Sequence, residues 1–125
     1  MNIHEIVESQ RRFFRTGATL PVSFRREMLQ RLLDAVNRYE AEIGKALAAD
    51  LGKSGYESFM CETGLARGEI SWMLRHVGRL ARERTVSTPL AQFAARSFRR
   101  PSPYGGTLIM SPWNYPILLT LSPLA

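Results

Sequence analysis

The sequence of 125 residues has an ordinary composition for a globular protein, with 45% hydrophobic and 22% charged residues. Its single cysteine, Cys61, excludes an internal disulfide, and neither a signal peptide nor an apolar run of membrane-spanning length is present. These features predict a cytoplasmic protein without a membrane span, whereas the net charge of +6 permits binding to nucleic acid.

The first 84 residues predict a helical segment. Gly17 and Gly52 follow the first and third helical patterns as stop signals, and Ser23 is suited to cap the second helix. Three glycines on the fourth helix, among them Gly64, indicate close packing or a local kink. Apolar side chains recur at helical spacing over residues 3–15, 23–39, 40–51 and 56–82.

After residue 84 the pattern changes to short strands. Residues 85–91 predict a loop around Pro89, and alternating side chains over residues 93–100 predict a strand. Two prolines then turn the chain. The apolar run at residues 105–110 predicts a second strand that runs back beside the first.

Charge is distributed unevenly along the chain. All 17 basic and all 11 acidic residues lie before residue 101, and residues 101–125 contain five of the seven prolines. A tail without charge should be buried, yet this one is too interrupted by proline to form a membrane helix. We therefore interpret the sequence as the N-terminal portion of a longer protein, with a helical segment at 1–84 and an incomplete second unit at 85–125.

Residues 105–116, GGTLIMSPWNYP, hold the most specific local pattern. Pro112 and Pro116 restrict the backbone on either side of Asn114 and its two aromatic neighbours. A turn after a strand end is where open α/β sheets bind ligands, and a fixed amide there could stabilise negative charge on a substrate oxygen. The alternative is that Asn114 caps the following helix, with Pro116 in its first turn.

The stretch Ser-Pro-Trp-Asn-Tyr-Pro, after an apolar strand and before an apolar helix start, resembles the aldehyde dehydrogenase superfamily, most of all its class 3 and fatty aldehyde dehydrogenase branch. Residues 46–52, ALAADLG, followed by the helix from Tyr56, are also similar. The resemblance implies an α/β fold in which N-terminal helices lead through a β-hairpin into the start of a Rossmann-like NAD(P)-binding domain, truncated here. It also implies NAD or NADP as cofactor, an aldehyde substrate and a homo-oligomer, which would be a dimer in the full enzyme.

The resemblance further implies roles for individual residues. The side-chain amide of Asn114 would hold the oxyanion that forms when a cysteine thiolate adds to the aldehyde, and Tyr115 would face the tail of the aldehyde. The nucleophile and the general base would lie beyond Ala125, because Cys61 sits in a helical pattern as a core residue; the isolated segment is expected to be inactive. The nicotinamide-ribose side would be lined by Met110, Ser111, Pro112 and Trp113.

Two other functions compete with this interpretation. Seven arginines could bind phosphate groups, as in a basic helical module that binds nucleic acid. They lack interleaved aromatics and a recognition-helix motif, so a solvated or subunit-facing surface is favoured and no nucleic-acid partner is expected. A partner-binding module without catalysis would leave residues 112–116 unexplained. The seven arginines are Arg75, Arg79, Arg82, Arg84, Arg96, Arg99 and Arg100.

No metal site is expected, since His4 and His76 lack the spacing of metal ligands.

Overall fold

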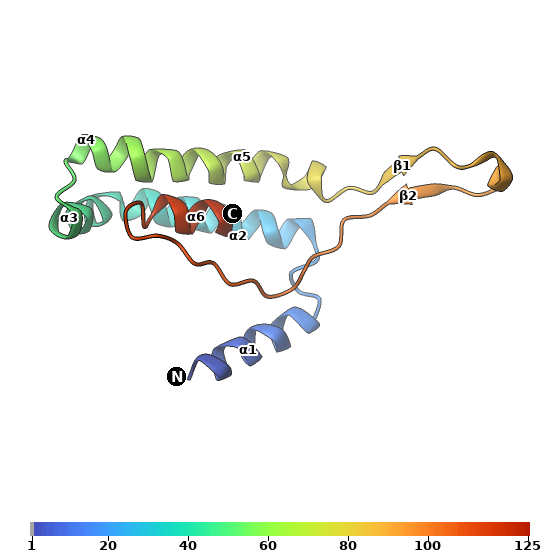
Figure 1. The fold of residues 1–125 in the computed structure, drawn as a ribbon, viewed down its shortest axis with the longest axis horizontal. Helices are drawn as coiled ribbons and strands as arrows, with labels where there is room; N and C mark the ends of the chain where they lie inside the picture. The colour runs from blue at the N-terminus through green and yellow to red at the C-terminus, as the bar shows by residue number, and fades with distance from the viewer. Residues whose placement is uncertain (1) are drawn as a thin grey trace.

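The computed structural model describes residues 2–125, which form a helical body and a projecting pair of strands (Figure 1). The α-helices are α1 (Ile3–Arg15), α2 (Val22–Arg38), α3 (Glu40–Leu51), α4 (Gly55–Ser58), α5 (Gly64–Leu80) and α6 (Leu118–Leu124). A π-helical turn, η1 (Phe59–Thr63), joins α4 to α5, and a 3₁₀ turn, η2 (Leu90–Gln92), separates strands β1 (Arg84–Val86) and β2 (Ser97–Arg99). Among residues 2–125, no helix combines the length and apolarity needed to cross a bilayer.

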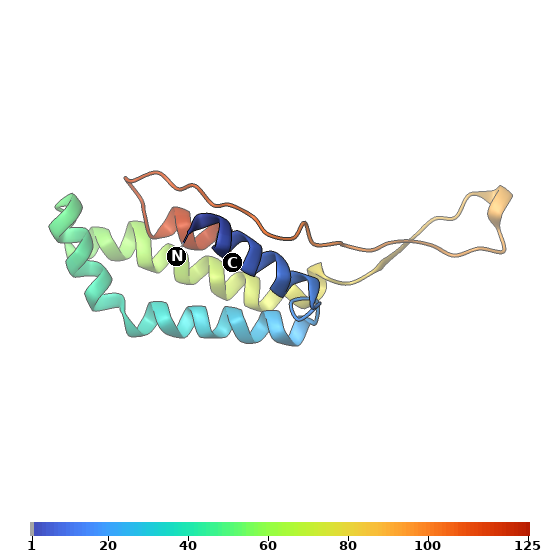
Figure 2. The same cartoon turned by 90° about the horizontal axis from the view of Figure 1, so that it is seen from below.

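The core lies between α2 and α5, which run side by side in opposite directions (Figure 1, Figure 2). Leu29 and Val36 of α2 are buried against Ile70 and Val77 of α5. Each pair is seven residues apart, which is two helical turns and therefore one face of the helix. Helix α6 packs on the same core through Leu121. The periodicity that predicted these helices is thus the periodicity of their buried faces.

The predicted bounds of the first and third helices, residues 3–15 and 40–51, are confirmed, and the second is displaced by one residue at each end. The fourth, predicted as one helix over residues 56–82, is divided into α4, η1 and α5 and ends at Leu80. Gly17 and Gly52 adopt positive φ angles of 74° and 66°, which explains why α1 and α3 end beside them. The predicted cap of α2 at Ser23 is wrong. Pro21 precedes the helix in extended conformation, and its carbonyl oxygen already accepts a hydrogen bond from the Arg25 N–H, so Ser23 falls inside the first turn.

The predicted strand pairing is also wrong in detail. Strand β2 covers only Ser97–Arg99, and the start of the predicted strand follows directly on the turn η2. Its partner is β1, which lies largely inside the predicted loop, with Thr85 opposite Phe98 in antiparallel register. Two N–H groups of Arg100 donate to Oε2 of Glu83 at 2.8 and 3.1 Å and close the open end of this hairpin.

Residues 105–110, predicted as the second strand, have no strand partner among residues 2–125. They belong to a long connection that runs from β2 back along the helical body to α6 (Figure 1). A strand requires a neighbour for its backbone groups, and the nearest antiparallel partner of β2 is already β1. The division between 84 and 85 stays a prediction.

Candidate functional site

The turn that carries Asn114 is anchored by Lys53, a residue 61 positions away. The Nζ of Lys53 donates a hydrogen bond of 2.8 Å to the backbone oxygen of Asn114. The same Nζ lies 2.5 Å from Oε1 of Glu62 and 4.2 Å from the centre of the Tyr115 ring. Lys53 is only 7% exposed, so its charge is balanced inside the protein by Glu62 and by these polar and aromatic neighbours.

Glu62 holds the other end of the same turn. Its side chain is fully buried, and Oε2 accepts hydrogen bonds from the backbone N–H groups of Ile117 at 3.0 Å and Leu118 at 2.9 Å. These N–H groups lie at the start of α6, where a helix has no internal acceptors and where a negative charge is favoured. Lys53 therefore fixes the backbone just before Tyr115, at Asn114, and Glu62 fixes it just after, at the start of α6.

Glu62 lies within the π-helical turn η1. In η1 the Gly64 N–H donates to the carbonyl oxygen of Phe59, five residues back, so one extra residue enters the helical turn. Within η1, Glu62 and Thr63 are buried, whereas Phe59 and Met60 are partly exposed. Glu62 thus faces α6 and the Asn114 turn.

Asn114 itself is exposed, and its side-chain amide forms no hydrogen bond with any other residue in the range 2–125. The alternative interpretation, in which Asn114 caps the following helix, is wrong. Helix α6 has Ile117 at its N-cap position without a local side-chain cap, and Glu62 provides the acceptor instead. The backbone of Asn114 is therefore fixed while its side chain is left available.

The remaining predicted site residues occupy the connection just before α6. Met110 and Trp113 are 84% and 85% exposed, and Pro112 is also exposed. The Oγ of Ser111 lies 2.7 Å from Oγ1 of Thr120 in α6, which adds a third anchor to the turn. The structure thus places these residues along one exposed segment, and their binding roles stay predictions.

Sequence reasoning missed Lys53 and Glu62. Lys53 lies between two helical patterns and Glu62 within one, and a lysine or glutamate in such places normally indicates a solvated surface. The one available signal was Gly64, which marked a local irregularity in the predicted helix. No residue pattern linked that irregularity to a turn more than fifty positions later.

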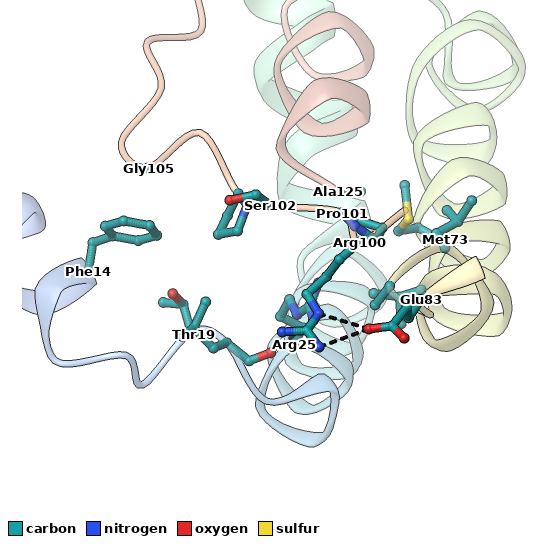
Figure 3. A pocket seen from close by; sticks show the side chains of 15 residues that line it. Phe14, Thr19, Arg25, Met73, Glu83, Arg100, Pro101, Ser102, Gly105 and Ala125 are labelled. Carbon is teal, nitrogen blue, oxygen red and sulfur yellow. Dashed lines mark hydrogen bonds and ion pairs between the residues drawn. The ribbon is translucent and has the colours of Figure 1, made fainter. Parts of the chain in front are cut away.

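A pocket with a volume of about 770 Å³ lies elsewhere in the chain (Figure 3). It is bordered by Phe14 of α1, by Arg25, and by the Glu83–Arg100 ion pair, with Gly105 at its edge. None of the predicted site residues lines it. We therefore do not assign the catalytic chemistry to this pocket.

The structure also shows the surroundings of Cys61, His76 and the seven arginines. Cys61 is a half-buried free thiol within η1. His76 stacks on Trp72 with ring centres 4.2 Å apart, and among residues 2–125 no three acidic, histidine or cysteine side chains cluster as metal ligands. Of the seven arginines, Arg96 and Arg100 both pair with Glu83.

Comparison with known proteins gives a consistent result. Residues 1–125 match the model of a family described as "Aldehyde dehydrogenase family". The 4,4'-diaponeurosporen-aldehyde dehydrogenase of Staphylococcus aureus is 38% identical over 90% of this chain and 24% of its own length. Rat aldehyde dehydrogenase family 3 member A2 is 37% identical over 94% of this chain and 24% of its own length. The chain therefore spans about a quarter of the curated relatives that it matches.

A solved structure described as the substrate-bound state of Staphylococcus aureus AldH superimposes with a TM-score of 0.94 at 37% identity. It covers 99% of this chain, which covers 27% of that structure. The match confirms the predicted α/β fold class, since the chain is mostly helical with one antiparallel strand pair, as expected for a truncated fragment of an α/β fold. The family 3 relatives confirm the predicted class 3 resemblance.

Proposed function

Because this chain belongs to the aldehyde dehydrogenase family, we propose that it forms the N-terminal part of an NAD(P)-dependent enzyme that oxidises an aldehyde to a carboxylic acid. In this proposal Asn114 donates its side-chain amide to the oxyanion of a cysteine thiohemiacetal. The nucleophilic cysteine and the general base come from residues outside the 125. The observation that supports Asn114 most directly is a backbone held by Lys53 together with a side-chain amide that has no partner among residues 2–125.

The addition of a thiolate to an aldehyde is favoured by a hydrogen-bond donor beside the carbonyl oxygen. When a thiolate adds to an aldehyde, the carbonyl oxygen gains negative charge, so a donor aimed at that oxygen binds the transition state more tightly than the substrate. A donor that is already held in place stabilises the charge without reorganisation. The anchored turn supplies this property, since the Asn114 backbone is restrained on one side by Lys53 and on the other by Glu62 through α6.

The neighbouring residues fit a nicotinamide ribose and a substrate tail. Met110 and Trp113 expose apolar surface on which a ring can pack, and the backbone groups of residues 110–113 make no hydrogen bonds within residues 2–125. These groups would hold the cofactor together with Ser111 and Pro112. NAD or NADP, when bound, supplies the hydride acceptor. Tyr115, partly covered by Lys53, would face the aldehyde's tail.

We further propose a cytoplasmic homo-oligomer, a dimer in the full enzyme. The hairpin β1–β2 projects from the helical body in both views (Figure 1, Figure 2). It exposes Phe98, and the loop at its tip exposes Leu90 and Phe93. Exposed aromatics on a projecting element are typical of a surface that contacts another subunit.

A basic module that binds nucleic acid is the second candidate. Arg84 lies directly opposite Arg99 in the strand pair, and both are exposed. Like charges in opposite positions are unfavourable unless solvent or an anion screens them. This observation alone would support a phosphate-binding role, but it does not account for the anchored Asn114 turn.

The test of the proposed activity is aldehyde-dependent reduction of NAD or NADP by the full-length protein that carries this chain. We expect reduction with at least one aliphatic or aromatic aldehyde and none with the 125-residue chain alone. A folded full-length protein that reduces neither cofactor with any aldehyde would contradict the proposal.

A further inference from the structure

Three groups meet at the Nζ of Lys53, one from the π-helical turn and two from adjacent residues of the Asn114 turn. They are the Glu62 carboxylate at 2.5 Å, the Asn114 backbone oxygen at 2.8 Å and the Tyr115 ring at 4.2 Å. An ammonium group has three N–H donors and a charge, so this set uses its bonding capacity almost completely. Lys53, which follows α3 in the chain, therefore contacts both the π-helical turn and the Asn114 turn.

We propose that Lys53 and Glu62 are positioning residues that set where the Asn114 amide is presented. This inference rests on the proposed function of Asn114 as oxyanion donor. Neither residue contacts the reacting atoms in this assignment. Lys53 acts on the Asn114 carbonyl, and Glu62 acts through Lys53 and through the backbone at the start of α6.

Within residues 2–125, few other polar contacts hold the Asn114 turn in place, so its position depends on Lys53 and Glu62. Residues 101–113 form no backbone hydrogen bonds with the rest of residues 2–125. Apart from Ser111, whose hydroxyl meets Thr120, the polar contacts that hold the turn to the helical body come from Lys53 and Glu62. A shift of about 1 Å in a positioned group can cost about 10²-fold in rate. Loss of this anchor should therefore affect turnover.

Energetic arguments indicate that the Lys53–Glu62 pair fixes the position of the Asn114 backbone more than it stabilises the fold. A buried ion pair is often no more stabilising than well-packed apolar residues of similar volume, because both charges lose their hydration. Hydrogen bonds are directional, whereas apolar contacts are not. Lys53 and Glu62 together therefore define a position for the Asn114 backbone that an apolar pair of the same size would not define.

The experiment is a mutant cycle in the full-length enzyme. The double variant Lys53→Met/Glu62→Gln removes both buried charges together, and the glutamine side chain keeps an oxygen that can accept from the Ile117 and Leu118 N–H groups. We expect a folded enzyme whose kcat is lower by about 10- to 100-fold, because the Asn114 carbonyl has lost its donor. The KM for the cofactor should change much less than kcat.

The decisive readout is coupling to Asn114, which a merely structural role would not produce. When Asn114→Ala is added to the double variant, kcat should fall little below that of Asn114→Ala alone, because the anchor acts only through the missing amide. The matched control is Arg67→Met/Glu40→Gln, which removes a half-exposed ion pair of 3.1 Å between α5 and α3. The control should leave kcat within about twofold of the unmodified enzyme.

Each contrary outcome has a separate meaning. If Asn114→Ala lowers kcat but the double variant Lys53→Met/Glu62→Gln does not, the positioning role is wrong and the proposed function stands. If the two losses multiply, Lys53 and Glu62 do not act through Asn114, and the positioning role is again wrong. If Asn114→Ala alone has near-normal kcat, the proposed function fails and this inference fails with it. Hydrogen exchange at residues 117 and 118 of the same samples should be faster in the double variant than in the control, because a neutral amide oxygen accepts these N–H groups more weakly than a carboxylate does.

Discussion

Gly64 and Phe59 approach so closely across the π-helical turn that a Cβ atom on Gly64 would lie 2.7 Å from the Phe59 carbonyl oxygen. The same oxygen accepts the Gly64 N–H, so the close approach belongs to the hydrogen bond that defines η1. The turn in this form therefore requires glycine at position 64. Glu62, whose carboxylate accepts from the Ile117 and Leu118 N–H groups, belongs to the same turn.

The first prediction concerns Gly64→Ala. In an ordinary helix this change is favourable by up to about 1 kcal/mol, but here the added methyl group must displace a backbone oxygen. We expect a loss of about 1–3 kcal/mol in the free energy of unfolding, as for other overpacked sites. The measurement is a urea unfolding curve of the protein with and without the substitution.

Gly68→Ala is the matched control for this prediction. Gly68 lies one turn further along α5, and a Cβ atom there would meet nothing within 4 Å. The control should be neutral or more stable than the unmodified protein. Equal unfolding midpoints for Gly64→Ala and Gly68→Ala would show that the close contact at η1 has no energetic consequence.

The second prediction concerns the buried ion pair. Lys53→Met alone leaves the fully buried Glu62 carboxylate without its cation, and we expect a loss of about 3–5 kcal/mol in stability. Lys53→Met/Glu62→Gln should recover most of this loss, because no unpaired charge then remains buried. Thermal or urea unfolding of both variants measures the difference.

An exposed ion pair serves as its comparison. Arg31 and Glu27 lie 2.6 Å apart on the solvent side of α2. Arg31→Met should change stability by less than about 1 kcal/mol, since solvent screens such pairs. A similar effect of Lys53→Met and Arg31→Met would mean that the Lys53–Glu62 pair is not desolvated in solution.

The third prediction concerns Asn114→Ala in the full-length enzyme. Removing one oxyanion donor typically lowers kcat by about 10²–10³-fold, or roughly 3–4 kcal/mol. Stability should change little, because the Asn114 side chain has no hydrogen-bond partner among residues 2–125 and Glu62 caps α6. Cofactor affinity should also change little. Turnover and the unfolding midpoint are measured on the same sample, and normal turnover with a lowered midpoint would refute the catalytic role.

The fourth prediction concerns the association of the 125-residue chain. Its uncharged segment from residue 101 exposes Leu108, Met110 and Trp113, and a contiguous apolar surface promotes association. We expect concentration-dependent self-association in size-exclusion chromatography and binding of an apolar dye. A monomer that is stable to dilution and binds no dye would contradict this expectation.

The fifth prediction concerns nucleic acid. If the exposed arginines are solvated or face a subunit, affinity for random duplex DNA at physiological salt should be no tighter than about 10⁻⁴ to 10⁻⁶ M. Fluorescence anisotropy with a labelled duplex measures it. Arg84→Ser/Arg99→Ser tests the opposed pair on the hairpin. Tight, sequence-selective binding that this double variant abolishes would favour the second candidate function.

Local sequence determined where helices α1, α2, α3 and α5 lie, although it did not reveal the π-helical turn η1. Helix formation depends on hydrogen bonds four residues apart and on a buried face that repeats every few residues, so Leu29 and Val36 on α2 could be recognised from spacing alone. The end of α3 was equally local, because only glycine adopts the positive φ angle of Gly52 without strain. The turn from residue 112 to 116 was recognisable because proline restricts the backbone regardless of context.

Tertiary structure alone decided the strand partners and the anchor of the candidate site. A strand pairs with whichever segment lies beside it, and sequence periodicity did not distinguish β1 from residues 105–110 as the partner of β2. Lys53 and Glu62 meet the Asn114 turn across more than fifty positions of the chain. Contacts over such separations depend on how the helices pack in space, and no local pattern of residues encodes that packing.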